Sequence, residues 1–147
     1  GAVLLDPGMG VGPTSWQGRI FVTQDITIQV IDRSAASDFT LSTIIPEVIS
    51  FEPGAVSATR AYPIAARDVH SFTLRALAGQ TMSVWVTSSN GIVLLGIYGY
   101  DDGQPYKRSS VGDPSYSFQL PRTQDYVIQV FSASDTSADF TLQVTVQ

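Results

Sequence analysis

Two stretches of this chain repeat each other at long range, and the repeat restricts the possible folds more than any other feature. TQDITIQV at residues 23–30 returns as TQDYVIQV at 123–130, with six of eight letters identical. DFTL at 38–41 returns at 139–142. Because repeated units fold alike, we expect the chain to contain two copies of one structural unit.

Apolar and polar residues alternate with a period of two over much of the chain. The clearest segments cover residues 26–31, 70–77, 81–87, 126–131 and 140–146. Such alternation places the apolar side chains on one face of a strand and the polar side chains on the other. Clusters of Gly, Pro and Asp, such as the DDGQP turn, separate the segments. The pattern predicts an all-β chain folded as an antiparallel, jelly-roll-like β-sandwich.

The repeat divides these strands unequally between the two copies. The second copy, residues 51–147, contains two blocks of strands that meet near Asn90. The first copy, residues 1–50, matches only the later block, since VLL at 3–5 corresponds to VLL at 93–95. We therefore predict a complete sandwich over the second copy and a half sandwich over the first, which another polypeptide completes. The start at Gly, without Met, suggests a processed product or a piece of something longer.

Composition excludes several classes of protein. Hydrophobic residues make up 44% of the chain and charged residues only 14%, which indicates a folded protein with an uncharged polar surface. The net charge is −5 and the eight Lys and Arg residues are scattered, so we expect no nucleic-acid partner. The absence of Cys excludes disulfides and thiolate metal sites. The apolar runs are too short to span a bilayer.

Three segments of the second copy share a pattern with a known family. They are Asp68 followed by SFTLRALAGQTMSVWV at 71–86, LLGIYGYDDG at 94–103, and SFQLPRTQDYVIQVFSASDTSADFTLQVTV at 117–146. The acidic residue before an aromatic-led strand, the Ala-Gly-Gln turn and the late hairpin resemble the bacterial pre-peptidase C-terminal (PPC) domain, although Phe140 stands where that family more often has Tyr. The resemblance implies a jelly-roll-like sandwich of secreted and cell-surface bacterial proteins, without catalytic activity of its own.

The resemblance also raises the question of calcium. Related collagen-binding modules bind Ca²⁺ and matrix protein, and their calcium ligands lie largely in an acidic segment before the first strand, where this chain offers the single carboxylate of Glu52. The densest carboxylates are instead Asp101, Asp102 and Asp113, and Ca²⁺ prefers such oxygens. Asp-Asp-Gly is equally typical of hairpin turns, and the spacing fits no EF-hand. We expect no cofactor, with Ca²⁺ at these three aspartates as the alternative.

The chain offers few groups for chemistry. Catalysis needs a nucleophile with a base, a carboxylate pair or a metal. His70 is the only histidine, and the neighbouring Ser71 points to the opposite face of the same strand. We therefore interpret His70 as a polar residue at a strand end and predict that the chain is not an enzyme. Tyr100 and Tyr106, in and beside the longest loop of the second copy, are candidate ligand-contact aromatics.

The half sandwich motivates the functional hypothesis. Its strands would leave an apolar face uncovered, formed by Val3, Leu5, Ile26, Ile28, Val30, Phe39 and Leu41. Burying each such side chain stabilises a protein by roughly 1.5 to 3 kcal/mol, so we expect another subunit to cover this face.

A contact of this kind that does not close on itself links subunits head to tail. We therefore predict a self-assembling structural protein on the outside of a bacterial cell, most simply a homo-oligomeric filament. The alternative is an accessory module that binds a surface glycan or matrix protein and was cut from a larger secreted protein.

Overall fold

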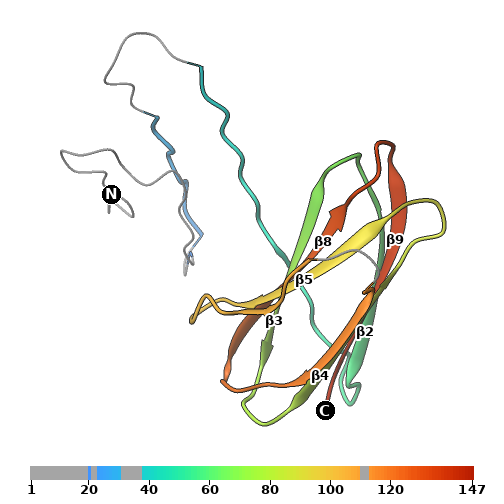
Figure 1. Cartoon of the computed structure of the whole chain (residues 1–147). Coiled ribbons are helices and arrows are strands. Elements are labelled where there is room, and N and C mark those ends of the chain that lie inside the picture. The colour runs from blue at the N-terminus through green and yellow to red at the C-terminus, as the bar shows by residue number, and fades with distance from the viewer. Residues whose placement is uncertain (1–19, 21–22, 31–37, 110–112) are drawn as a thin grey trace. The chain divides into compact units, whose positions relative to one another are not determined.

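A computed structural model describes residues 20, 23–30, 38–109 and 113–147 (Figure 1). The chain divides into two compact units, residues 1–41 and residues 42–147. Each unit is described by itself.

Residues 42–147 form a sandwich of two β-sheets (Figure 1). The five-stranded sheet has the order β1 (Glu47–Val48), β3 (Val69–Ala76), β8 (Gln124–Ser132), β5 (Val93–Gly99), β6 (Pro105–Lys107). The four-stranded sheet has the order β2 (Ser57–Ile64), β9 (Ala138–Val146), β4 (Thr81–Thr87), β7 (Ser115–Gln119). All neighbouring strands are antiparallel except β1 and β3. The predicted all-β sandwich is confirmed.

The core lies between the two sheets and is built from the apolar phase of each alternating strand. β4 shows the rule most clearly, since Met82, Val84 and Val86 are fully buried and the residues between them face outward. Two inner strands, β8 and β9, contribute half of the remaining core cluster. Their side chains in this cluster are Tyr126, Ile128, Val130, Ala138, Phe140, Leu142, Val144 and Val146.

The sandwich begins before residue 51, earlier than the repeat indicates. β1 pairs in parallel with β3, with Glu47 opposite Phe72 and Val48 opposite Thr73. The N–H of Ile49 then donates to the carbonyl of Thr73 at 2.8 Å, and the Ile49 side chain is only 5% exposed. β1 is therefore an edge strand of the five-stranded sheet, and a strand of two residues is too short to show an alternating pattern in the sequence.

The first unit differs from what the sequence predicts. Strands are expected at residues 26–31 from the alternation and at residues 38–41 from the repeat of DFTL, but the described residues 23–30 and 38–41 contain no strand. A strand needs a hydrogen-bonded neighbour. In the second copy, β8 pairs with β3, and β9 pairs with β2 and β4. The repeat includes no second copy of β2, β3 or β4. The half sandwich completed by another polypeptide stays a prediction.

Within the described residues, no helix is long and apolar enough to cross a membrane.

Candidate functional site

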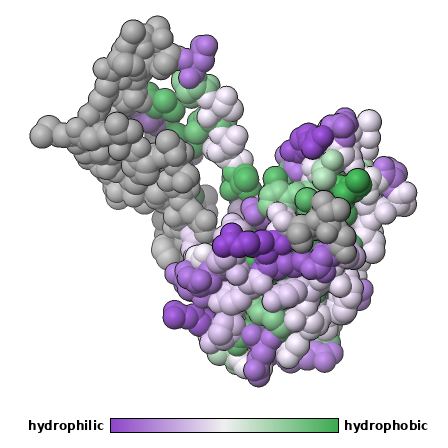
Figure 2. Space-filling model, viewed as in Figure 1, coloured by the Kyte–Doolittle hydropathy of each residue, from purple (hydrophilic) through white to green (hydrophobic). Residues whose placement is uncertain are grey.

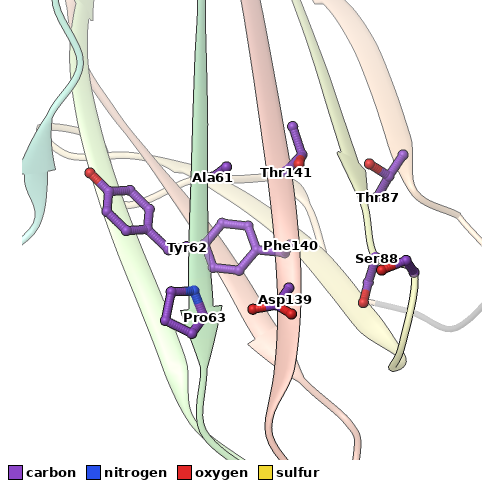
Figure 3. A pocket seen from close by; sticks show the side chains of 9 residues that line it. Ala61, Tyr62, Pro63, Thr87, Ser88, Asp139, Phe140 and Thr141 are labelled. Carbon is purple, nitrogen blue, oxygen red and sulfur yellow. The ribbon is translucent and has the colours of Figure 1, made fainter.

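A shallow pocket opens at one end of the four-stranded sheet (Figure 3). Its volume is about 390 Å³. Three consecutive residues of β2, three of β9 and the end of β4 with its following turn line it: Ala61, Tyr62, Pro63, Asp139, Phe140, Thr141, Thr87, Ser88 and Ser89. Hydroxyl groups and one carboxylate thus surround a partly apolar floor.

The turn from Ser88 fixes one wall of the pocket through Asn90. The side-chain amide of Asn90 donates to Asp139 Oδ2 at 3.3 Å, and the N–H of Asp139 donates to Asn90 Oδ1 at 2.8 Å. These two bonds hold the turn after β4 against the start of β9. The pocket therefore has a defined shape, although it lies at the surface.

An exposed tryptophan lies on the outer face of the same sheet. Trp85 is 43% exposed, in the polar phase of β4, with Gln143 of β9 and Ser115 of β7 directly opposite. Thr87 follows on the same face and lines the pocket. Trp85 and the pocket therefore belong to one continuous surface.

The turn between β5 and β6 contains a dense polar network around Asp102. Tyr106 donates its hydroxyl hydrogen to Asp102 Oδ2 at 2.7 Å, and the Gln124 amide donates to the same oxygen at 3.0 Å. The N–H of Gln104 donates to Asp102 Oδ1 at 3.0 Å. Gly99 leaves the space for this network, because a Cβ there would overlap with Asp102 and Gln124.

The protonation of this network follows from its contacts. Burial acts to raise the pKa of the Asp102 carboxyl, but its hydrogen-bond donors, helped by the guanidinium of Arg122, hold that pKa below its usual value. Burial and the hydrogen bond to Asp102 raise the pKa of Tyr106 to about 12. The pair is therefore an ionised carboxylate accepting from a neutral phenol, a stable structural contact at neutral pH.

The three candidate calcium ligands lie in different surroundings. Both oxygens of Asp102 accept hydrogen bonds from protein donors. Asp113 pairs with the buried ammonium of Lys107 at 2.5 Å, and Asp101 is exposed in the turn. No group of three or more metal-ligating side chains is found among the described residues.

The two candidate ligand-contact tyrosines are only partly accessible. The ring of Tyr106 stacks on Phe118 with centroids 5.0 Å apart, and its hydroxyl is engaged by Asp102. Tyr100 is also half-buried, and its N–H donates to the carbonyl of Asp125 at 2.8 Å. Their role in ligand contact stays a prediction.

His70 lies in an aromatic stack at the edge of the core. Its ring stacks between Tyr62 at 4.8 Å and Phe72 at 4.6 Å, centroid to centroid, and its Nε2 lies 3.8 Å from Glu47 Oε2. Ser71 faces the other side of β3, where its hydroxyl accepts from the Gln129 amide at 3.3 Å. The structure thus places the serine and the histidine on opposite faces of the strand.

The expected interface residues are exposed where the structure describes them. Exposure ranges from 40% for Ile26 to 66% for Phe39, with Ile28, Val30 and Leu41 between these values. Figure 2 shows hydrophobic residues of this unit, in green, at its surface. The other two expected interface residues, Val3 and Leu5, lie outside the described residues.

Comparisons with known proteins support the fold. No protein-family model matches the chain, and no curated protein matches it. Among solved structures, PliG of Aeromonas hydrophila, a periplasmic inhibitor of g-type lysozyme, is 25% identical with a TM-score of 0.61, over 71% of this chain and 97% of that chain.

The sandwich is similar to PliG. A second PliG, from Salmonella Typhimurium, is 18% identical with a TM-score of 0.52, over 68% of this chain and 96% of that one. The pre-peptidase C-terminal domain of a Bacillus anthracis collagenase is 12% identical with a TM-score of 0.56, over 74% of this chain and 100% of that domain. The PPC-like β-fold is therefore confirmed, at the level of fold.

Sequence reasoning missed Trp85 and the pocket beside it. In TMSVWVT the core phase is Met82, Val84 and Val86, so Trp85 stands at a position that the alternation assigns to solvent. An apolar residue of that size in the polar phase is the signal that could have found it. The pocket gave no comparable signal, because its walls come from segments that lie far apart in the sequence.

Proposed function

We propose that the chain is a non-catalytic binding protein of the bacterial cell surface or extracellular space, whose first unit binds a second polypeptide by strand complementation. In self-assembly, the second polypeptide is another copy, and head-to-tail repetition gives a filament. The observation that carries the proposal is the exposed apolar face of the first unit, at Ile26, Ile28, Val30, Phe39 and Leu41.

The second copy supplies the physical argument. Residues 123–130 and 139–142 match residues 23–30 and 38–41, and all of them except Thr123 lie in β8 and β9. Each of these strands lies inside its sheet, with β8 between β3 and β5 and β9 between β2 and β4. The matching segments of the first copy therefore require hydrogen-bonded neighbours, and an incoming polypeptide would supply the counterparts of β2, β3 and β4.

Light scattering coupled to size-exclusion chromatography tests the proposal on the full chain. We expect a mass above the 15.8 kDa of one chain, rising with concentration. The double variant Ile28→Asp with Val30→Asp should shift the protein to monomer, because it places two charges in the buried phase. A matched control, Thr27→Asp with Gln29→Asp, charges the alternate phase of the same segment and should leave the assembly in place.

Two results would contradict this function. One is a full chain that stays monomeric at the highest concentration reached while the segment of residues 23–30 is protected from proteolysis. The other is equal loss of assembly in the test variant and in the control that charges the alternate phase, which would assign the effect to added charge alone.

The likeness to PliG favours a second candidate function. The sandwich spans 97% of the Aeromonas protein, whose description as a periplasmic inhibitor of g-type lysozyme supports a role in binding a protein outside the cytoplasm. In this second candidate function the second unit binds a lysozyme and reduces its activity. Turnover of a g-type lysozyme on cell-wall substrate, measured with increasing amounts of this chain, tests it; unchanged turnover at a large molar excess would exclude it.

A further inference from the structure

The outer face of the four-stranded sheet combines one exposed aromatic ring with uncharged polar neighbours. Trp85 is surrounded by Gln143 and Ser115 on the adjacent strands and by Ser83 and Thr87 along β4. Trp85 is 43% exposed, whereas Ser83, the preceding outward residue of β4, is small and polar. A single exposed aromatic residue is ordinary on a protein surface, so the neighbours of Trp85 decide what this face can bind.

The charge on this face indicates the class of ligand. Asp139 is the only charged residue at the outward positions of β2, β4, β7 and β9, and it lies at the pocket end of the face. The remaining outward residues are Ser, Thr, Gln, Ala, Pro and Trp. A strongly charged ligand would find almost no counter-charge here, so the face complements a neutral one.

A neutral polysaccharide meets these conditions better than a protein does. Protein interfaces gather several apolar and aromatic residues at their centre and are poor in Ser, whereas this face has one aromatic ring among hydroxyls and amides. The apolar face of a sugar ring carries C–H groups that are attracted to the negative face of an indole. Sugar hydroxyls both donate and accept, as Ser, Thr and Gln side chains do.

The pocket continues the outer face of the sheet beyond Trp85, in the direction of β4. Thr87 lies two residues beyond Trp85, roughly 7 Å along the strand, and it lines the pocket together with Thr141. With a volume of about 390 Å³, the pocket is large enough for a small polar unit and its solvation. A chain lying over Trp85 along β4 would reach the pocket with its next unit.

We propose that this face binds a neutral polysaccharide, with Trp85 stacked on one sugar ring, Gln143 and Ser115 bonded to its hydroxyls, and an adjacent sugar in the pocket beside Thr87. The proposal rests on the second unit alone. It is therefore independent of strand complementation by the first unit.

Native affinity electrophoresis of the full chain tests the proposal. The gels contain laminarin, hydroxyethylcellulose, glucomannan or dextran as neutral polysaccharides and alginate as the anionic comparison; insoluble cellulose and chitin are tested by pull-down. We expect at least one neutral polysaccharide to bind, and Trp85→Ala to weaken that binding roughly tenfold or more. Gln143→Ala should weaken it less, and Trp85→Tyr should retain part of it.

Ile92→Ala is the matched control, because Ile92 is 56% exposed and lies outside this face. It should bind like the parent chain, as should the Ile28→Asp, Val30→Asp variant. In a Trp16→Phe background Trp85 is the only tryptophan, so its fluorescence should shift to shorter wavelength on addition of the bound polysaccharide.

Three results would overturn the proposal. They are no binding to any of the six neutral polysaccharides, binding to alginate alone, and equal weakening by Trp85→Ala and Ile92→Ala. Circular dichroism of each variant separates loss of binding from loss of fold.

Discussion

At the scale of single residues, Asp102, one of the three candidate calcium ligands, organises the turn between β5 and β6. Its side chain is only 8% exposed, and its oxygens accept from Tyr106, Gln124 and the N–H of Gln104. Gln124 in turn accepts from the N–H of Asp101 at 3.1 Å. A buried polar group that is fully paired in this way fixes the conformation of a turn, because any other conformation leaves donors or acceptors unpaired.

We expect Tyr106→Phe to lower the free energy of unfolding by about 1.5 to 3 kcal/mol at pH 7, since it removes a hydrogen bond to a charged group. The lowered pKa of Asp102 means that its carboxylate stabilises the fold above the unfolded value of about 3.9, and that this contribution is lost as pH falls through the folded value. The difference between parent and variant should therefore shrink below about pH 4.

Urea unfolding of both proteins from pH 3 to pH 7 measures this effect. Asp101→Asn is the control, because it changes an exposed carboxylate in the same turn and should have little effect. A pH-independent difference for Tyr106→Phe would show that packing, and not the charged hydrogen bond, accounts for the loss.

At the scale of elements, β1 is the shortest of the described strands and yet closes one edge of the sandwich. Glu47 accepts from Arg60 Nε at 3.0 Å and lies 3.8 Å from His70 Nε2, so its carboxylate joins β2 of the four-stranded sheet to β3 of the five-stranded sheet. A hydrogen bond with the same Glu47, aided by burial, raises the pKa of Tyr62. The two residues at the end of this segment differ in burial, because Ile49 packs in the core and Val48 is exposed to solvent.

This difference in burial predicts a large loss of stability for one substitution and almost none for its neighbour. Ile49→Ala should lower the free energy of unfolding by about 2 to 5 kcal/mol, because the side chain is 5% exposed and leaves a cavity. Val48→Ala should change it by no more than about 0.5 kcal/mol, because that side chain is 66% exposed. Equal effects in chemical denaturation would show that β1 does not pack as described.

At the scale of the whole molecule, the complete core belongs to residues 42–147. Both sheets, their hydrogen bonds and every buried core side chain among the described residues lie within this unit. The described part of residues 1–41 contributes exposed apolar residues and no strand. The second unit should therefore fold without the first.

We expect residues 42–147, expressed alone, to melt cooperatively within about 4 °C of the main transition of the full chain, a difference below about 1 kcal/mol. A shorter piece, residues 51–147, lacks β1 and Ile49 and should melt about 8 °C lower or more. Differential scanning calorimetry at matched concentrations measures both. A fragment of residues 42–147 that fails to melt cooperatively would contradict an independent second unit.

The sequence by itself determined the elements of the second unit, because a period of two is a local property that each strand carries in its own residues. Segments 70–77, 81–87, 126–131 and 140–146 all lie in or largely overlap observed strands, and the sandwich follows from their number and turns. The contact between Asp102 and Gln124 and the stack of His70 between Tyr62 and Phe72 join residues of different strands or turns. Only the tertiary structure brings such residues together. The exposure of Trp85 follows from its place in the alternation of β4, which is local to the sequence. The pocket beside it is formed only where β2, β4 and β9 meet, so it depends on the tertiary structure.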